Sequence, residues 1–424
     1  MIALVLAGGG AKGAYQAGCI KALKELGYNF DYVTGTSIGA LNGLLVVQED
    51  YQALYRLWDQ MKISDIFAHP VNFDFSIESM LSQTNLIKPF FKSYLNEKGA
   101  DITPLKNILY RLYDDQKARN SKIDYGIVTV KYPSLTPLEI TKTKMKSPLV
   151  EYALASASCF PAFPVHYIDN QGYIDGGYFD NLPISLALKK QPEQIIAIEL
   201  NQETAHPHFL NRPNLTIIRP SYHLGKFLDF NRDILDWRIK LGYYDTLKTF
   251  NRFMGYRYTF KKEQIDRDYL LTIYHLILNY EDQINKSIVT KKISQSSTPL
   301  TDLLIADTYL ITLELNDYFI RALEITMETY HYQNDLLYNF DQVCKELLVS
   351  FNKKNKKRYK ILKSHFQDIP IKEIFNTIKT LSSNDAICAF YHSLKTEEPI
   401  EPGIISNIFL KEYLIALFFL TISK

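Results

Sequence analysis

A serine stands in the pattern Gly-x-Ser-x-Gly at residues 35–39. It is Ser37, with Gly35 and Gly39 on either side. In a nucleophile elbow, this pattern forms a strained turn between a strand and a helix, and the turn pushes the serine hydroxyl out of the sheet. The residues before it are typical of a strand, and those from Ile38 onward are typical of a helix. The pattern therefore makes Ser37 a candidate nucleophile, with an ordinary Gly-Ser turn as the alternative.

A glycine-rich stretch, GGGAKG, lies between the first strand-like run and the first helical pattern. Its glycines permit a tight turn and leave backbone N–H groups exposed at a helix N-terminus, where the helix dipole favours an anion. The stretch also matches G-x-G-x-x-G, which makes a dinucleotide site an alternative, but no acid ends the second strand to hold a ribose. A P-loop is excluded because glycine, instead of Ser or Thr, follows the lysine. The residues concerned are Gly8, Gly9, Gly10, Lys12 and Gly13.

Asp175 is an acid that could take the proton of Ser37. It follows a short apolar run and precedes Gly176 and Gly177. Such a sharp, open turn can present the carboxylate to a neighbouring group, although a plain Asp-Gly turn is the structural alternative. The stretch just upstream, ASASCFPAFP at residues 155–164, is rich in small residues and prolines. That composition suits a segment that lines a close-packed site.

A histidine base is the other way to remove a proton from Ser37. In α/β-hydrolases the chain order is Ser, then an acid, then His. An elbow of that fold follows several strands, whereas only two strand-like runs precede Ser37 here. The histidines downstream also lack a glycine-rich or strand-end setting, so we favour Asp175 over them. They are His166, His206, His208 and His223.

The elements that position these residues alternate along the first half of the chain. Short apolar runs closed by glycines predict buried strands, and apolar residues at three- to four-residue spacing predict helices. Strands separated by helices indicate a parallel sheet covered on both faces, which is an α/β layer fold. The expected strands are 2–6, 32–34, 125–130, 194–200 and 215–218, and the expected helices are 14–26 and 38–47.

Taken in chain order, these motifs resemble the patatin-like phospholipase family. GGGAKG is similar to the family's glycine-rich oxyanion motif, GTSIG to its nucleophile motif, and DGG to its catalytic aspartate motif. ASASCFPAFP resembles the block of small residues and prolines before that aspartate. The resemblance covers roughly residues 1–230 and implies a three-layer, patatin-like α/β fold with a mainly parallel central sheet.

The resemblance further implies a lipid acyl hydrolase of the phospholipase A type, with a Ser37–Asp175 dyad and neither cofactor nor metal. Burial should raise the pKa of Asp175 from its usual ~3.9 toward that of a useful base. Lys12 could steady the glycine-rich loop or meet a lipid phosphate, and a solvated lysine at a helix start is the alternative. The expected oxyanion donors are the N–H groups of Gly8, Gly9, Gly10 and Ile38. The supporting residues are Gly13, Gly35, Gly39, Gly176 and Gly177.

Composition narrows the class of protein. The 424 residues carry a net charge of +2, and 46% are apolar, which argues for a folded protein and against a dedicated nucleic-acid binder. Four scattered cysteines without a CxxC pair argue against a zinc site or disulfide framework. No apolar run approaches the ~20 residues of a membrane-spanning helix. We therefore expect a cytoplasmic protein, and the resemblance implies that it contacts phospholipid or another acyl lipid peripherally.

Two other functions stay open at this point. The first is a nucleotide-binding oxidoreductase, which the glycine-rich stretch alone favours. The second is a lipid-binding or regulatory module that is catalytically silent. Nothing in the sequence indicates the oligomeric state, the head group or the acyl chain.

The second half of the chain shows a different pattern, with helical periodicity in place of alternating strands and helices. We expect an acyl hydrolase domain at 1–255 and an all-helical domain of unknown role at 256–424, without a convincing strand. Residues 353–363 hold seven positive charges and no acid, which is typical of a solvated face, the interpretation that we favour, or of a membrane-surface or nucleic-acid patch. The apolar run 413–422 predicts a buried closing helix, because it is half the length of a membrane anchor.

Overall fold

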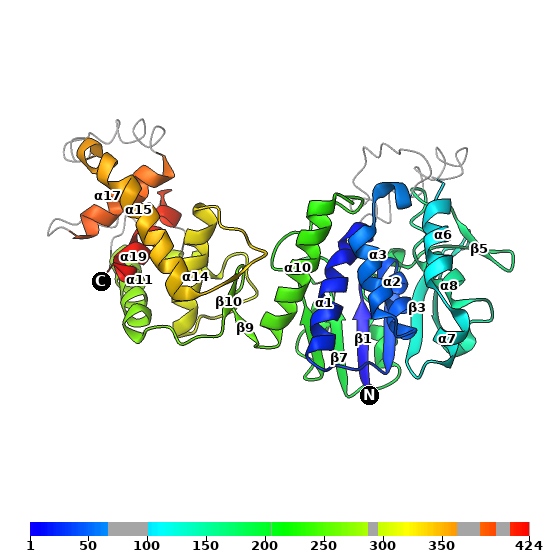
Figure 1. Cartoon of the computed structure of the whole chain (residues 1–424). Coiled ribbons are helices and arrows are strands. Elements are labelled where there is room, and N and C mark those ends of the chain that lie inside the picture. Colours follow the sequence, from blue (N-terminus) through cyan, green and yellow to red (C-terminus); the bar gives the residue numbers. More distant parts are fainter. Residues whose placement is uncertain (67–100, 205, 287–295, 363–381, 396–407, 424) are drawn as a thin grey trace. The chain divides into compact units, whose positions relative to one another are not determined.

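The computed structural model describes residues 1–66, 101–204, 206–286, 296–362, 382–395 and 408–423. The chain divides into two compact units, residues 1–250 and 251–424 (Figure 1). The division falls between residues 250 and 251, whereas the sequence suggested 255 and 256. Each unit has its own apolar core.

The first unit is built on an eight-stranded sheet. Its order is β5-β6-β3-β2-β1-β7-β8, and β4 pairs with β3 outside this path. The pairs β3-β2, β2-β1, β1-β7 and β7-β8 are parallel, whereas the pairs that involve β4, β5 or β6 are antiparallel. The strands are β1 (Ile2–Leu6), β2 (Tyr32–Thr36), β3 (Asp124–Tyr132), β4 (Thr136–Thr141), β5 (His166–Ile168), β6 (Gln171–Asp175), β7 (Gln194–Ile198) and β8 (Leu215–Ile218).

The five strands expected from apolar runs are β1, β2, β3, β7 and β8, and they form the parallel part of the sheet. Helices cover both faces there, which is why the sequence of these strands is almost continuously apolar. The antiparallel edge was not expected as strands. β4 is exposed or half-buried along its length, and β5 has three residues, so neither produces a clear periodic signal.

Helices lie on both faces of this sheet. A Cβ added at Gly43 of α2 would lie 3.5 Å from the Tyr125 ring, whereas one added at Gly126 would lie 3.1 Å from Leu186 of α9. Neighbouring residues of a strand point to opposite faces, so α2 and α9 cover opposite faces and the fold has three layers. The helices of this unit are α1 (Gly13–Glu25), α2 (Ile38–Val47), α3 (Tyr51–Gln60), α6 (Thr103–Leu112), α7 (Asp115–Asn120), α8 (Leu149–Ser156), α9 (Ile184–Leu188) and α10 (Arg232–Thr249).

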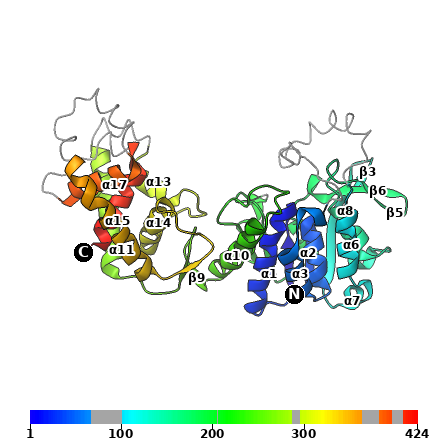
Figure 2. The same ribbon diagram turned by 45° about the horizontal axis from the view of Figure 1, so that its top comes forward.

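α1 and α10 lie side by side in both views of the ribbon (Figures 1 and 2). They approach so closely that a Cβ added at Gly18 would lie 1.9 Å from the Ile239 carbonyl oxygen, and one added at Gly242 would lie 2.1 Å from the Tyr15 carbonyl oxygen. The Tyr15 hydroxyl also donates to Asp245 over 3.0 Å. Glycine therefore sets the distance between the two helices.

The second unit is mainly helical, as expected. Its helices are α11 (Arg267–Lys286), α13 (Pro299–Ile305), α14 (Leu315–Thr329), α15 (Phe340–Leu362), α17 (Ser383–Lys395) and α19 (Leu410–Ile422). The expectation of no strand is corrected by a small sheet in the order β11-β10-β9. Its strands, β9 (Phe253–Met254), β10 (Thr259–Lys261) and β11 (Leu337–Tyr338), have two or three residues each and are too short for a periodic signal.

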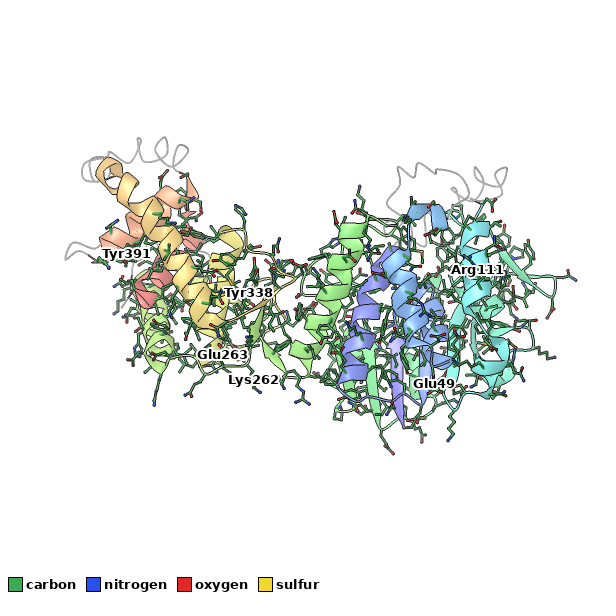
Figure 3. The ribbon with its side chains drawn as sticks, viewed as in Figure 1. Glu49, Arg111, Lys262, Glu263, Tyr338 and Tyr391 are labelled. Atoms are coloured by element: carbon green, nitrogen blue, oxygen red, sulfur yellow. The ribbon has the colours of Figure 1, made fainter. Side chains whose placement is uncertain are left out.

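Aromatic side chains fill the core of the second unit. Phe260 stacks on Phe340 with ring centroids 4.4 Å apart, and Phe351 stacks on Phe419 at 4.2 Å. Tyr338, labelled in Figure 3, lies beside Phe260. Some of the aromatic residues, which make up 13% of the sequence, therefore pack in this core.

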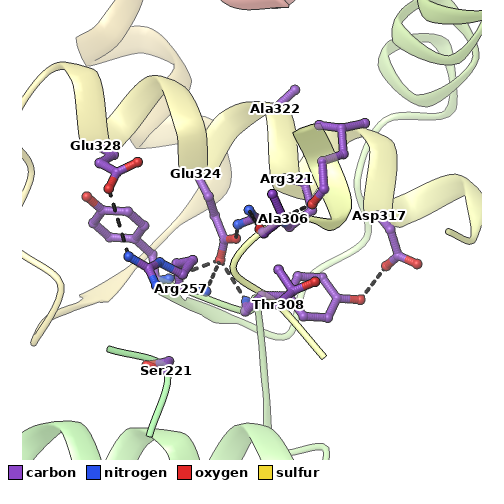
Figure 4. A network of polar contacts seen from close by, with 12 residues as sticks. Ser221, Arg257, Ala306, Thr308, Asp317, Arg321, Ala322, Glu324 and Glu328 are labelled. Atoms are coloured by element: carbon purple, nitrogen blue, oxygen red, sulfur yellow. Dashed lines mark hydrogen bonds and ion pairs between the residues drawn. The ribbon is translucent and has the colours of Figure 1, made fainter. Parts of the chain in front are cut away.

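A buried ion pair ties the start of this unit to α14 (Figure 4). Glu324 accepts hydrogen bonds from the backbone N–H groups of Tyr256, Arg257 and Tyr258 at 2.7–3.0 Å. Its other carboxylate oxygen lies 2.5 Å from the Arg321 guanidinium. Because both charges are buried, each depends on these partners.

α19 is buried in the core of the second unit, which confirms the helix expected at 413–422. The basic stretch 353–363 begins within α15, but its side chains from 354 onward lie outside the described residues. No helix of the described ranges combines the length and the apolar character that crossing a membrane requires.

Candidate active site

Ser37 occupies the turn between β2 and α2. Its backbone angles, φ 54° and ψ −125°, are rare for a residue with a side chain. The backbone N–H of Ser37 donates to the Ser156 hydroxyl over 2.9 Å, and that hydroxyl donates to the Val128 carbonyl over 2.6 Å. The strained conformation is thus held by α8 and β3, which is typical of residues whose position serves a function.

The two glycines around Ser37 permit this turn. A Cβ added at Gly39 would lie 2.3 Å from the Leu6 carbonyl oxygen, and one added at Gly35 would lie 2.4 Å from the Gly39 carbonyl oxygen. Both distances are below any real Cβ contact. Gly-x-Ser-x-Gly is therefore the spacing that lets α2 start directly against β1.

The glycine-rich loop lies beside Ser37. A Cβ added at Gly8 would lie 3.1 Å from the Ser37 Cβ. The Gly8 N–H donates to the Asn181 carbonyl over 3.0 Å, so Gly8 is not the oxyanion donor that the sequence suggested. Among the residues that the structure describes, no acceptor contacts the N–H groups of Gly9, Gly10 or Ile38.

Lys12 is buried, with 2% of its surface exposed. Its ammonium group donates to the Asn201 side chain over 3.3 Å. Of the two roles suggested by the sequence, this contact supports the steadying of the loop. Gly13 begins α1, and a Cβ there would lie 2.4 Å from the Ile38 side chain, so the loop and the serine turn pack directly together.

Asp175 ends β6 at the same side of the sheet. In the register of the sheet, β3 places Val128 opposite Thr36 of β2 and Thr129 opposite Asp175 of β6. A Cβ added at Gly176 would lie 2.1 Å from the Val128 carbonyl oxygen, so glycine allows this turn to approach β3. The strands therefore bring together two residues that are 138 positions apart in the chain.

The carboxyl group of Asp175 is buried, and its pKa is shifted. Burial raises its pKa from 3.8 to about 6, against the lowering effect of hydrogen bonds from the Gly177 N–H and the Ser37 side chain. The bond from Gly177 measures 2.7 Å. The expectation that burial raises this pKa is confirmed, and the Ser37 side chain lies close enough to Asp175 to act on the pKa of its carboxyl group.

The described histidines do not contact either residue. His166 lies 2.8 Å from Glu151, and burial lowers the pKa of this histidine. His206 lies 2.9 Å from Asp180, and the hydrogen bond that the aspartate accepts from the histidine ring raises the histidine pKa. Within the described ranges, no histidine hydrogen-bonds Ser37 or Asp175. The side chains of His166 and His206 are therefore engaged by other carboxyl groups.

A buried polar network behind the site was missed from the sequence. The Gln16 amide donates to the Ala7 carbonyl at 2.8 Å, while Asn42 donates to Gln16 at 2.9 Å and accepts from the Trp58 indole at 2.9 Å. The network links the glycine-rich loop to α1, α2 and α3. One signal was available: Asn42 is the only polar side chain in the run IGALNGLLVV, and a buried amide needs partners.

The first unit is thus an α/β protein with a strained serine and a buried aspartate at one edge of its sheet. Residues 4–188 match the family model of patatin-like phospholipases, so this segment is similar to that family. Patatin-like phospholipase domain-containing protein 7 of Rattus norvegicus is 28% identical over 205 residues, which cover 47% of this chain. Lysophospholipase NTE1 of Debaryomyces hansenii is 25% identical over 203 residues, again 47% of this chain.

These relatives are much longer than the chain. The matched segments cover 13% of the rat protein and 12% of the yeast protein. Among solved structures, VipD from Legionella pneumophila aligns with a TM-score of 0.40 and 14% identity, over 77% of this chain and 85% of that one.

Proposed function

We propose that the chain is a lipid acyl hydrolase of the phospholipase A type. The observation that carries the proposal is the strained turn that holds Ser37 beside the buried carboxyl group of Asp175, whose pKa is raised by burial and influenced by the Ser37 side chain. The phospholipase and lysophospholipase names of the relatives favour a phospholipid or related acyl lipid as the substrate. The protein would reach its substrate from the cytoplasm by peripheral contact with a membrane.

The first chemical step is acylation of the serine. The Ser37 oxygen attacks the ester carbonyl while Asp175 accepts the serine proton, which later passes to the departing alcohol or lysolipid. A carboxyl group with a pKa of about 6 is ionised at neutral pH, yet it is a stronger base than an ordinary aspartate.

The negative charge that develops on the carbonyl oxygen needs donors. The N–H groups of Gly9, Gly10 and Ile38 are available, and each donor of this kind contributes roughly 3 kcal/mol to the transition state. Ile38 adds a second advantage, because it begins α2 and the positive end of a helix dipole lies there.

Deacylation completes the cycle. Water attacks the acyl-serine while Asp175 accepts a proton from the water; the bond to the Ser37 oxygen then breaks, that oxygen takes the proton from Asp175, and the fatty acid is released. Both steps use the same two side chains, so loss of either one should stop turnover.

The test is mass spectrometry of mixed phospholipid vesicles incubated with the full chain and with Ser37→Ala. Fatty acid and lysolipid released by the wild type alone would support the proposal and reveal which acyl position is cleaved. Equal release by both proteins would refute the role of Ser37. Vesicle binding by both proteins without any release would instead support a catalytically silent lipid-binding module.

A further inference from the structure

The glycine-rich loop is held by a residue that the family match does not reach. The Ala11 N–H donates to the Phe227 carbonyl over 2.8 Å, and residue 227 lies beyond the matched segment 4–188. A Cβ added at Gly10 would lie 2.6 Å from that carbonyl oxygen and 2.9 Å from the Phe227 ring. Gly10 has a φ of 55°. Phe227 therefore sets the turn that carries the Gly9 and Gly10 N–H groups.

The loop that contains Phe227 depends in turn on Arg238 of α10. This side chain is fully buried. Its guanidinium donates to three carbonyl groups, those of Leu224 at 2.8 Å, Lys226 at 3.0 Å and Asp229 at 2.8 Å. The planar guanidinium can serve three acceptors at once, which the single ammonium of a lysine cannot do in the same geometry. One side chain thus fixes the loop on both sides of Phe227.

Contacts other than those of Arg238 hold α10 on α1. α10 is held on α1 by the close approach at Gly18 and by the hydrogen bond from Tyr15 to Asp245. The three hydrogen bonds of the guanidinium go to the loop instead. Burial lowers the pKa of Arg238 to about 10, so the group stays charged at neutral pH.

We propose that Arg238 is a positioning residue for the oxyanion hole, acting through the Phe227 carbonyl on the turn at Gly10 and Ala11. The inference rests on the proposed function, because only an acyl hydrolase uses these N–H groups to stabilise an oxyanion. It adds a requirement that residues 4–188 alone do not contain.

The first experiment compares full-length Arg238→Lys with wild type on a soluble chromogenic ester. We expect kcat to fall by about tenfold or more, since displaced donors stabilise the transition state less. KM should change by no more than about twofold, because the loss is confined to the transition state. The pH midpoint should remain that of Asp175, which Arg238 does not touch. Wild-type kcat in this variant would overturn the inference.

Arg232→Lys is the matched control. Arg232 also lies on α10 and also donates to backbone carbonyls, those of Trp58 and Asp59, but these belong to α3. We expect this variant to lose thermal stability without the fall in kcat. An equal fall in kcat for both variants would show a general effect of weakening α10 and would also overturn the inference.

A second measurement does not depend on activity. Hydrogen exchange of the Ala11 amide in the intact chain reports the bond to Phe227 directly, and Arg238→Lys should accelerate it relative to Arg232→Lys. Gly225→Ala keeps Arg238 but strains the same loop, where φ is 77°, and should accelerate this exchange as well. If Ala11 exchange were unchanged in both Arg238→Lys and Gly225→Ala, the proposed positioning role of Arg238 would be overturned. A wild type that cleaves no ester would instead refute the proposed function.

Discussion

At the scale of single residues, the site joins two unfavourable features. Ser37 has a strained backbone, and Asp175 has a carboxyl group with only 2% of its surface exposed. Residues in unfavourable states persist only where their surroundings hold them, and such residues concentrate at functional sites. Ser156 provides that support for Ser37, and Gly177 provides it for Asp175.

The raised pKa of Asp175 predicts the pH dependence of hydrolysis. In the proposed mechanism Asp175 is the base and must be ionised, so kcat/KM should rise with pH and level off above a midpoint near 6. A pH series from 4.5 to 8 on a soluble ester measures this midpoint. A midpoint near 4, the ordinary value for aspartate, would show that burial does not tune this group.

The same pKa predicts a gain of stability when Asp175 is replaced. The folded protein holds its proton up to about pH 6 and the unfolded chain only up to 3.8. The folded state therefore binds the extra proton between these values, and its stability falls as the pH rises through that window. Asp175→Asn removes this loss, so the variant should be inactive yet more stable than wild type above pH 6, by about 2–3 kcal/mol.

Urea unfolding at pH 4.5 and at pH 8 tests this expectation. Ser37→Ala is the control, because it is also inactive but keeps the titrating carboxyl group. The stability advantage of Asp175→Asn should appear at pH 8 and shrink at pH 4.5. An advantage that is equal at both pH values would contradict the assigned pKa.

At the scale of elements, the site depends on how closely helices and strands can approach. The serine turn, the glycine-rich loop and the aspartate turn belong to three separate connections of the sheet. In the serine turn and the aspartate turn, glycines let backbone contact backbone, at Gly39 against β1 and at Gly176 against β3. The Gln16–Asn42–Trp58 network then fixes the helices behind them.

The α1–α10 approach makes a prediction in which packing and helix propensity disagree. Alanine is favoured over glycine within a helix by about 1 kcal/mol. Gly18→Ala should nevertheless destabilise the protein, because its Cβ would lie 1.9 Å from the Ile239 carbonyl oxygen. Gly27→Ala is the control, since that Cβ would meet nothing within 4 Å, although a φ of 88° leaves some strain there.

Thermal unfolding of both variants tests whether the close approach of α1 and α10 outweighs helix propensity. We expect Gly18→Ala to melt well below wild type and below Gly27→Ala. If Gly18→Ala matched or exceeded the wild-type melting temperature, α1 and α10 would have to be further apart than described.

At the scale of the whole molecule, the matched family segment and the folded unit differ in extent. The family match ends at residue 188, whereas the first unit runs to residue 250. β7 lies beyond the match, yet it pairs with β1 in the centre of the sheet. α10, which packs on α1, also lies beyond it. A cut at 188 would remove parts of the core.

Two fragments test this difference. Residues 1–250 should fold alone, show one cooperative thermal transition and hydrolyse a soluble ester, because the unit has its own core. Residues 1–188 should not fold, since β1 would lose a partner strand along its whole length. A folded 1–188 fragment, or an unfolded 1–250 fragment, would contradict the division of the chain into these units.

Much of the first unit could be predicted from local patterns. The strands of the parallel sheet, the helices that follow Lys12 and Ser37, and the motifs around Ser37 and Asp175 all have short-range signals. The small sheet of the second unit could not be predicted, because strands of two or three residues carry no period. The role of Gly8 could not be predicted either, since its N–H is taken by Asn181, a residue far along the chain.

By itself, the sequence determined the kinds of residue that could react and the local elements that carry them, because strand, turn and helix signals extend over only a few neighbouring positions. Only the tertiary structure decided which of those residues meet. Strand order brings Asp175 to Ser37, burial then raises the aspartate pKa, and the packing of α10 and its preceding loop selects the conformation of the glycine-rich turn. Pairing, burial and close approach are properties of distant segments, so no local pattern contains them.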